Sequence, residues 1–118
     1  MHELAVASRL LERALSVAED HDADRIDGLT VAVGEVTHLA PDQLRFCLSA
    51  AADGTPAEGA TVDIESVPPE GECDCGWRGA PERIDATVAA PRRRCPECGA
   101  TIDLVAGDDC DLAAVDLP

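Results

Sequence analysis

The beginning of the chain carries a helical and then a strand-like pattern of apolar positions. Between Glu3 and about Asp20, apolar residues recur at steps of three and four, which predicts an amphipathic helix. The apolar positions are Leu4, Ala7, Leu11, Ala14, Leu15 and Ala18. From Leu29 to Gly34, leucine and valines alternate with other residues. This period of two predicts a strand after the helix.

A second helix and further strands are predicted downstream. Pro41 suits the first turn of a helix, which Gly54 ends. The apolar stripe of this helix is Leu44, Cys47, Leu48 and Ala51. Alternation over residues 60–65 predicts a strand that stops at Pro68, because proline has no N–H for a ladder. Residues 108–117 alternate loosely, so we expect a last strand that returns to the first sheet.

Residues 70–106 differ from the rest of the chain. They show little helical periodicity, are rich in glycine and proline, and contain four of the six cysteines. A segment so poor in apolar side chains needs a cross-link or a metal to fold. The other two cysteines, Cys47 and Cys110, stand alone in apolar surroundings and are expected in the core.

The clustered cysteines have the spacing of a zinc site. Cys95 and Cys98 are separated by two residues and followed by Gly99, as in a zinc knuckle. Cys73 and Cys75 are separated by only one residue, yet positions two apart in an extended run share a face and can chelate. The sequence therefore predicts a zinc ribbon held by Cys73, Cys75, Cys95 and Cys98, with Cys110 as a less favoured substitute for Cys73.

Redox chemistry is the main alternative for the Cys-Pro-x-Cys segment. A redox dithiol is expected to follow a strand and open a helix. Here Gly99 follows directly, and residues 101–105 have an extended pattern. A closed four-thiolate zinc site predicts a fold and not catalysis. The chain also offers no nucleophile beside a base, so we expect no enzyme activity.

Charge narrows the function classes further. The 118 residues include nine arginines, no lysine and 24 acidic residues, which gives a formal charge of -15. Such a chain repels nucleic-acid phosphate and anionic lipid, and it suits a very salty cytosol in which charges are screened. The sequence shows neither an apolar span of membrane length nor a positively charged secretory start. We expect a soluble cytoplasmic protein.

The first three residues have unusual ligand chemistry. The α-amine of Met1, the deprotonated backbone amide of His2 and its imidazole can close adjacent chelate rings on one ion, and Glu3 can add an oxygen. Such a tetragonal set suits Ni²⁺ or Cu²⁺. In the simpler interpretation, Glu3 favours the helix start and His2 is a solvated terminal residue. His38 is a further candidate ligand only if the fold brings it near His2.

Taken together and in order, these motifs resemble the HypA/HybF family of nickel chaperones for [NiFe] hydrogenase maturation. The resemblance spans essentially the whole chain. The motifs that carry it are Met1-His2-Glu3, residues 31–35, residues 41–46, Gly59-Ala60 leading to Ile64-Glu65, the paired cysteines, and Gly107-Asp108-Asp109 before the last strand.

The resemblance implies a fold, a domain division and a site. The implied fold class is α+β, with two helices on a short mixed β-sheet and an inserted zinc-ribbon domain. The nickel-binding domain is then 1–68 plus 107–118, and the zinc domain is 69–106. His2 is implied as the principal nickel ligand, with the amine of Met1 and with Glu3 beside it, and the four clustered cysteines as the zinc set.

The resemblance also implies partners, and the sequence departs from the family at three places. The implied partners are the [NiFe] hydrogenase large-subunit precursor and a maturation GTPase of the HypB type. The first cysteine pair of the family usually has two intervening residues, and Asp109 stands where glutamate is common. The zinc segment has no histidine to serve as an accessory nickel ligand. Monomer and homodimer both remain open.

A second function class is a zinc-ribbon module that binds nucleic acid or transcription machinery. Its support is limited to Arg92-Arg93-Arg94 beside Cys95 and to Trp77 as a possible stacking residue. The strong overall acidity favours a solvated surface or an acidic protein partner as the explanation of the arginine run.

Overall fold

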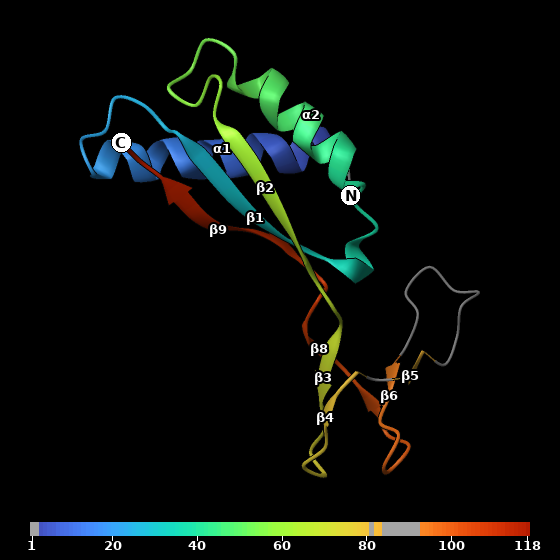
Figure 1. The fold of residues 1–118 in the computed structure, drawn as a ribbon. Helices are drawn as coiled ribbons and strands as arrows, with labels where there is room; N and C mark the ends of the chain where they lie inside the picture. The colour runs from blue at the N-terminus through green and yellow to red at the C-terminus, as the bar shows by residue number, and fades with distance from the viewer. Residues whose placement is uncertain (1–2, 81, 84–92) are drawn as a thin grey trace.

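The computed structural model describes residues 3–80, 82–83 and 93–118 and shows an elongated molecule. Its extents are 52 × 28 × 17 Å and its radius of gyration is 17.2 Å, whereas a compact domain of this length has about 13–14 Å. Figure 1 shows two regions end to end. We call residues 3–68 and 107–118 the α/β region, and residues 69–106 the cysteine region.

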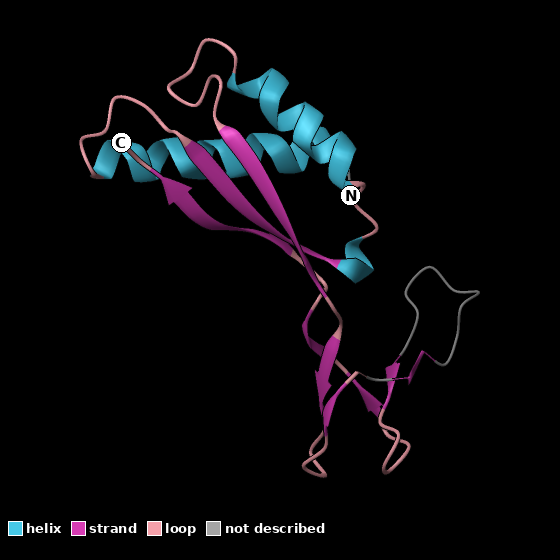
Figure 2. Ribbon diagram, in the orientation of Figure 1, coloured by secondary structure: helices cyan, strands magenta, loops and turns pink. Residues whose placement is uncertain are grey.

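The α/β region is a three-stranded mixed sheet with two helices (Figures 1 and 2). Its strand order is β2-β1-β9, with β1 parallel to β2 and antiparallel to β9. This confirms the expected α+β class. The elements are α1 (Glu3–Asp20), β1 (Gly28–Gly34), the 3₁₀ turn η1 (Glu35–Thr37), α2 (Pro41–Ala52), β2 (Thr61–Val67) and β9 (Cys110–Asp116).

Both helices pack against the same face of β1. Val31 and Val33 point toward this face and share one apolar cluster with residues of α1 and α2. Members of this cluster are Val6, Ala7, Leu10, Val31, Val33, Leu39, Leu44, Leu48 and Cys110. A second cluster, around Ile26 and Leu29, fills the other end of the region. The burial of alternate β1 residues explains why the period of two was visible in the sequence.

The buried face of α1 is rotated from the predicted stripe. Leu4 is 61% exposed, whereas Val6 and Leu10, which the predicted stripe omits, are buried. The helix contacts α2 as well as the sheet, so its buried face is centred between these two neighbours. The repeat of three and four was right, but the sequence does not show on which side a second helix lies.

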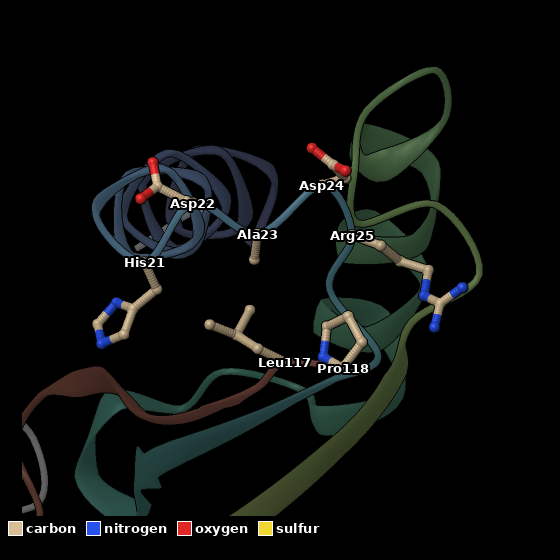
Figure 3. A pocket seen from close by; sticks show the side chains of 7 residues that line it. All are labelled: His21, Asp22, Ala23, Asp24, Arg25, Leu117 and Pro118. Atoms are coloured by element: carbon tan, nitrogen blue, oxygen red, sulfur yellow. The ribbon is translucent and has the colours of Figure 1, made fainter.

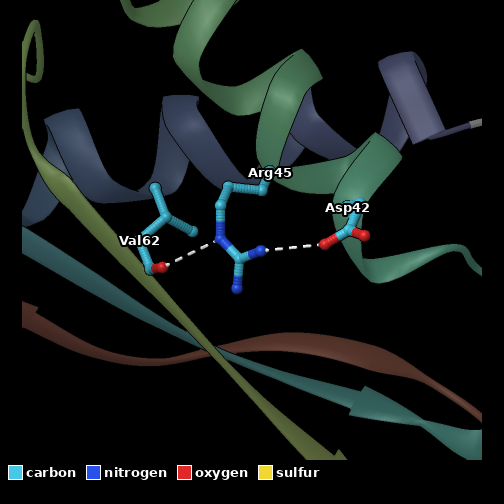
Figure 4. A network of polar contacts seen from close by, with 3 residues as sticks. All are labelled: Asp42, Arg45 and Val62. Carbon is cyan, nitrogen blue, oxygen red and sulfur yellow. Dashed lines mark hydrogen bonds and ion pairs between the residues drawn. The ribbon is translucent and has the colours of Figure 1, made fainter.

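An arginine contacts each outer strand of the sheet. Arg45 of α2 donates from Nε to the Val62 carbonyl of β2 over 3.3 Å and pairs with Asp42 over 3.1 Å (Figure 4). Arg9 of α1 donates to the Cys110 carbonyl of β9 over 2.8 Å. A charged side chain over a strand edge discourages pairing with another chain.

The chain crosses between the two regions at a tight junction. It leaves through Pro68 and returns through Gly107, whose carbonyl accepts a hydrogen bond from the Val36 N–H over 2.9 Å. Gly34 donates to the Asp109 carbonyl over 2.8 Å. A Cβ at Gly34 would collide with the Gly107 carbonyl group and lie 2.8 Å from the Asp109 carbonyl oxygen. Only glycine allows this approach.

The cysteine region contains two small antiparallel sheets. One has the order β4-β3-β8 and the other β5-β6-β7. The strands are β3 (Glu70–Glu72), β4 (Arg78–Gly79), β5 (Glu82–Arg83), β6 (Arg93–Arg94), β7 (Thr101–Ile102) and β8 (Leu104–Ala106). In the run of three arginines, Arg93 and Arg94 therefore form a strand, and Arg92 lies outside the described residues. Within the described part of the chain, no helix is long and apolar enough to cross a membrane.

Candidate metal centre

Two tight turns present the clustered cysteines. The first joins β3 to β4, where the Cys73 N–H donates to the Trp77 carbonyl over 2.8 Å and the Gly76 N–H donates to the Cys73 carbonyl over 2.9 Å. The second joins β6 to β7, where the Gly99 N–H donates to the Cys95 carbonyl over 2.9 Å. Both glycines have positive φ angles, 97° and 78°, which glycine tolerates.

The two turns bring the four predicted sulfurs together. The Cys73 and Cys98 sulfurs are 3.5 Å apart, and the Cys75 and Cys95 sulfurs are 3.7 Å apart. All four lie within 4.8 Å of one another. Zinc–sulfur bonds of about 2.3 Å in a tetrahedron place the sulfurs about 3.8 Å apart. The observed cluster therefore fits a zinc ion with four thiolate ligands.

Each short sulfur–sulfur distance joins one turn to the other, so a bound ion would cross-link the two small sheets. Cys73 and Cys95 are buried, whereas Cys75 and Cys98 are exposed. The one-residue gap between Cys73 and Cys75 does not separate their sulfurs, because the hairpin turn directs both toward the second turn. Protein sulfurs fill all four positions of such a site, which is the arrangement of structural zinc.

The thiols of the cluster differ in acidity. At Cys75 the Trp77 backbone N–H lowers the pKa, but hydrogen bonding with the neighbouring thiols and burial outweigh it and raise the pKa to about 12. At Cys95 burial raises the pKa, but the backbone N–H groups of Cys98 and Glu97 outweigh it and lower the pKa to about 7. A bound cation would favour the thiolate forms of Cys73 and Cys75, whose pKa values are raised.

The other two cysteines lie away from the cluster. Cys110 is 1% exposed and belongs to the apolar core of the α/β region, where burial raises the pKa of its thiol. Cys47 is half-buried and packs against the same core. Both positions agree with the prediction that these are core residues. The geometry favours Cys73 over Cys110 as the fourth member of the cluster.

The segment after Cys98 is extended. Thr101–Ile102 form strand β7 directly beyond the turn. The Cys95–Cys98 pair therefore does not begin a helix, whose N-terminus would stabilise a reactive thiolate. The backbone N–H groups near the Cys95 sulfur come from the turn itself. The effect of these N–H groups on the pKa of the Cys95 thiol could have been anticipated only from the Cys-Pro-Glu-Cys spacing.

The predicted nickel ligands Met1 and His2 lie outside the described residues. Glu3 is the first residue of α1, and its Oε1 accepts a hydrogen bond from the Ala40 N–H over 3.3 Å. The start of α1 thus lies beside the segment that joins η1 to α2. No sequence pattern indicates this contact, because Glu3 and Ala40 are 37 positions apart.

Comparison with known proteins matches nearly the whole chain to one protein family. Residues 1–117 match the family described as "Hydrogenase/urease nickel incorporation, metallochaperone, hypA". The hydrogenase maturation factor HypA of Methanothermobacter thermautotrophicus is 37% identical over 113 residues, covering 95% of this chain and 93% of that protein. HypA of Methanopyrus kandleri is 38% identical over 134 aligned positions, covering 99% and 93% of the two chains.

The fold also matches a solved structure. The solution structure of the Ni metallochaperone HypA from Helicobacter pylori superposes with a TM-score of 0.76. The alignment covers 99% of this chain and 97% of that one at 22% sequence identity. The fold, the four-cysteine cluster and the full-length family match agree, and the chain belongs to the HypA family of nickel metallochaperones for hydrogenase maturation.

Proposed function

We propose that this protein binds Ni²⁺ through Met1, His2 and Glu3 and delivers it to the [NiFe] hydrogenase large-subunit precursor. In this proposal Cys73, Cys75, Cys95 and Cys98 hold a permanent structural zinc ion. The observation that carries the proposal is the completeness of the four-sulfur cluster. A site closed by four thiolates has no open position for a transferable ion, so the cargo requires a second donor set.

The first three residues provide that second set. The Met1 amine and the amide and imidazole nitrogens of His2 are the ligand types that Ni²⁺ prefers in tetragonal geometry, and Glu3 supplies an oxygen. The α-amine and the imidazole must lose their protons to bind, so nickel affinity should rise between about pH 6 and 8. A site at a chain end exchanges its ion more easily than an enclosed one.

Delivery is then a ligand exchange and involves no covalent change in the protein. The matched relatives are hydrogenase maturation factors, which supports the large-subunit precursor as the recipient and a GTPase of the HypB type as a second partner. The charge of -15 argues against nucleic acid as a partner. We infer that this exchange takes place in the cytoplasm.

A blocked N-terminus tests the site assignment. We expect His2→Ala, or a Gly-Ser extension before Met1, to abolish nickel loading of the hydrogenase precursor while zinc content and helical circular dichroism stay unchanged. His21→Ala is the matched control, because His21 is at the opposite end of α1, which is about 27 Å long. Nickel loading that persists in both N-terminal variants would refute the assignment.

A further inference from the structure

The four clustered cysteines alternate in exposure along the chain. Cys73 and Cys95 are buried, whereas Cys75 and Cys98 are exposed. Each short sulfur–sulfur contact joins one exposed thiol to one buried thiol, over 3.5 Å for Cys98 with Cys73 and over 3.7 Å for Cys75 with Cys95. We propose that the cluster is also a site of reversible oxidation, at which a neutral hydroperoxide converts each of these exposed–buried pairs into a disulfide and thereby releases the zinc ion. The inference uses the proposed zinc site and does not depend on the nickel ligands.

The contacts determine which cysteines pair. Four cysteines allow three pairings, and the observed contacts favour the two that cross from one turn to the other. Sulfurs 3.5 and 3.7 Å apart each need to move by less than about 1 Å to reach the disulfide bond length of about 2.05 Å. The crosswise disulfides also join residues that are 25 and 20 positions apart. Loops of this length restrict the unfolded chain more than loops closed within one turn.

Crosswise disulfides keep the connection that a zinc ion would provide. Either of them ties the β3–β4 turn, which carries Cys73 and Cys75, to the β6–β7 turn, which carries Cys95 and Cys98. Disulfides within the turns would leave the two small sheets unlinked. A region with so little apolar burial needs a cross-link or a metal, so we expect the crosswise oxidised form to stay folded without the ion.

The surroundings of the exposed thiols favour an uncharged oxidant. Cys75 and Cys98 line a surface cavity together with three acidic residues, Glu72, Asp74 and Asp103. In the part of the chain that the structure describes, no basic residue lines this cavity. Its negative potential repels an anionic oxidant such as glutathione disulfide. Hydrogen peroxide is small and neutral, so the carboxylates do not hinder its approach.

The oxidation of each pair has two steps. The exposed thiolate attacks one oxygen of hydrogen peroxide, the O–O bond breaks, and the sulfur becomes a sulfenic acid while the hydroxide that leaves is protonated to water. The buried thiolate then attacks the sulfenic sulfur, forms the S–S bond and expels a second hydroxide, which is also protonated. Each disulfide thus consumes one peroxide, two thiolates and two protons. Disulfide sulfurs are no longer thiolate ligands, so the cluster loses its affinity for zinc.

Other titratable side chains show no comparable gathering. His21, Asp22 and Asp24 line a pocket at the end of α1, but in Figure 3 the ring and the carboxylates point in different directions. The Nδ1 atom of His21 lies 2.9 Å from the Val17 carbonyl oxygen, and His38 is exposed in the loop before α2. Among the described residues, the four cysteines are the only three or more His, Cys, Asp or Glu whose ligand atoms gather in one place.

The test treats untagged, zinc-loaded wild-type protein with hydrogen peroxide. A colorimetric indicator follows zinc release, and the remaining thiols are then alkylated in denaturant. The unreduced protein is digested with a protease that cleaves after acidic residues. Asp74 lies between the first two cysteines and Glu97 between the second two, so the digest separates all four, and mass spectrometry identifies their pairing.

We expect two crosswise disulfides and the consumption of about two equivalents of peroxide per zinc released. Dithiothreitol should restore the thiols and the zinc binding. Glutathione disulfide at the same concentration should release zinc at least about tenfold more slowly. In the oxidised protein, the fluorescence of Trp77 should stay closer to that of the zinc form than to that of the reduced, zinc-free form.

Two variants test the pairing independently. Cys75→Ser removes the exposed member of one pair, so the disulfide of Cys73 with Cys98 should still form while Cys95 is recovered as a free thiol. Cys47→Ser is the control, because Cys47 packs against the core of the α/β region, and it should match the wild type. The pairing in the wild-type protein does not depend on whether Cys75→Ser retains zinc.

The outcomes separate this inference from the proposed zinc site. Disulfides within the turns, or thiols that stay reduced at peroxide concentrations that oxidise free cysteine, overturn it. Zinc release that dithiothreitol does not reverse also overturns it. Equal rates with glutathione disulfide overturn the choice of oxidant. Reduced protein that holds no zinc contradicts the structural zinc site, and the pairing in that zinc-free protein then decides this inference alone.

Discussion

The α/β region and the cysteine region are stabilised by different interactions. The α/β region buries leucines, an isoleucine and valines from the helices, the sheet and the adjoining loops in two clusters. In the described part of the cysteine region, the buried residues are Gly71, Cys73 and Cys95. No aliphatic side chain is fully buried among those described residues, so hydrophobic burial stabilises one region and contributes little to the other.

Approximate magnitudes explain why both regions can fold. Burial of one leucine or valine side chain contributes about 1.5–3 kcal/mol, and the α/β region has many such side chains. Structural zinc contributes about 10–16 kcal/mol of apparent folding free energy in isolated zinc modules at neutral pH. A single ion can therefore take the place of an apolar core in the cysteine region. Removal of the ion and truncation of a core side chain should each destabilise one region and leave the other folded.

Removal of zinc should have the largest effect, and it should be confined to one region. Trp77 is the only tryptophan and lies beside the first cysteine turn, so its fluorescence reports on the cysteine region. We expect a strong chelator to change this fluorescence and unfold the two small sheets, while the helical circular dichroism of α1 and α2 remains. Loss of the helical signal together with the zinc would contradict the independent stability of the two regions.

Acidification should also release zinc. Thiols bind zinc as thiolates, so protons compete with the metal. The Cys95 thiol, whose pKa is lowered to about 7, is ionised above that pH and regains its proton below it in the metal-free cluster. Zinc affinity should therefore fall as the pH decreases, and more steeply below about 7, where the Cys95 thiol also regains its proton. A zinc release measurement that showed tighter binding at lower pH would reverse this expectation.

A core substitution in α2 should have the next largest effect, in the opposite region. Leu44 is fully buried, so Leu44→Ala should lower the free energy of unfolding of the α/β region by about 2–5 kcal/mol. The midpoint followed by helical circular dichroism should fall, while the Trp77 transition and the zinc content stay unchanged. Phe46→Ala is the control on the same helix, because Phe46 is 69% exposed. Equal effects from the two variants would count against the assigned core.

The smallest effect is expected at the junction between the regions. The neighbouring carboxylate of Asp111 and partial desolvation raise the pKa of Asp109. Its ionised form therefore costs stability near neutral pH, and the cost disappears as the pH falls through the raised pKa. Asp109→Asn should stabilise the protein by about 0.5 kcal/mol or less. The gain should vanish in high salt, and Asp24→Asn should show no comparable gain in the same melts.

The sequence predicted the elements whose pattern depends on local burial. Alternation along β1 and the repeat of three and four in α1 were visible because one face of each contacts the core. The cysteine cluster was predictable because turn chemistry places glycine next to the second cysteine of each pair. The contact of Glu3 with Ala40 and the close approach of Gly34 to Gly107 depend on distant segments, so no local pattern encodes them. In the cysteine region, the extended pattern over residues 101–105 anticipated β7 and most of β8. The other short strands were missed because two or three residues carry no measurable period.

Competition dialysis of the untagged protein, loaded with both metals, tests most directly whether the two metals occupy separate sites. The protein is dialysed against a nickel chelator of moderate strength, and both metals are then measured by mass spectrometry. We expect one nickel per chain to leave while one zinc remains, with no nickel bound initially in His2→Ala. Retention of nickel in place of zinc, with a thiolate-to-nickel absorption band, would contradict the separation of a transferable ion at the N-terminus from a permanent one among the cysteines.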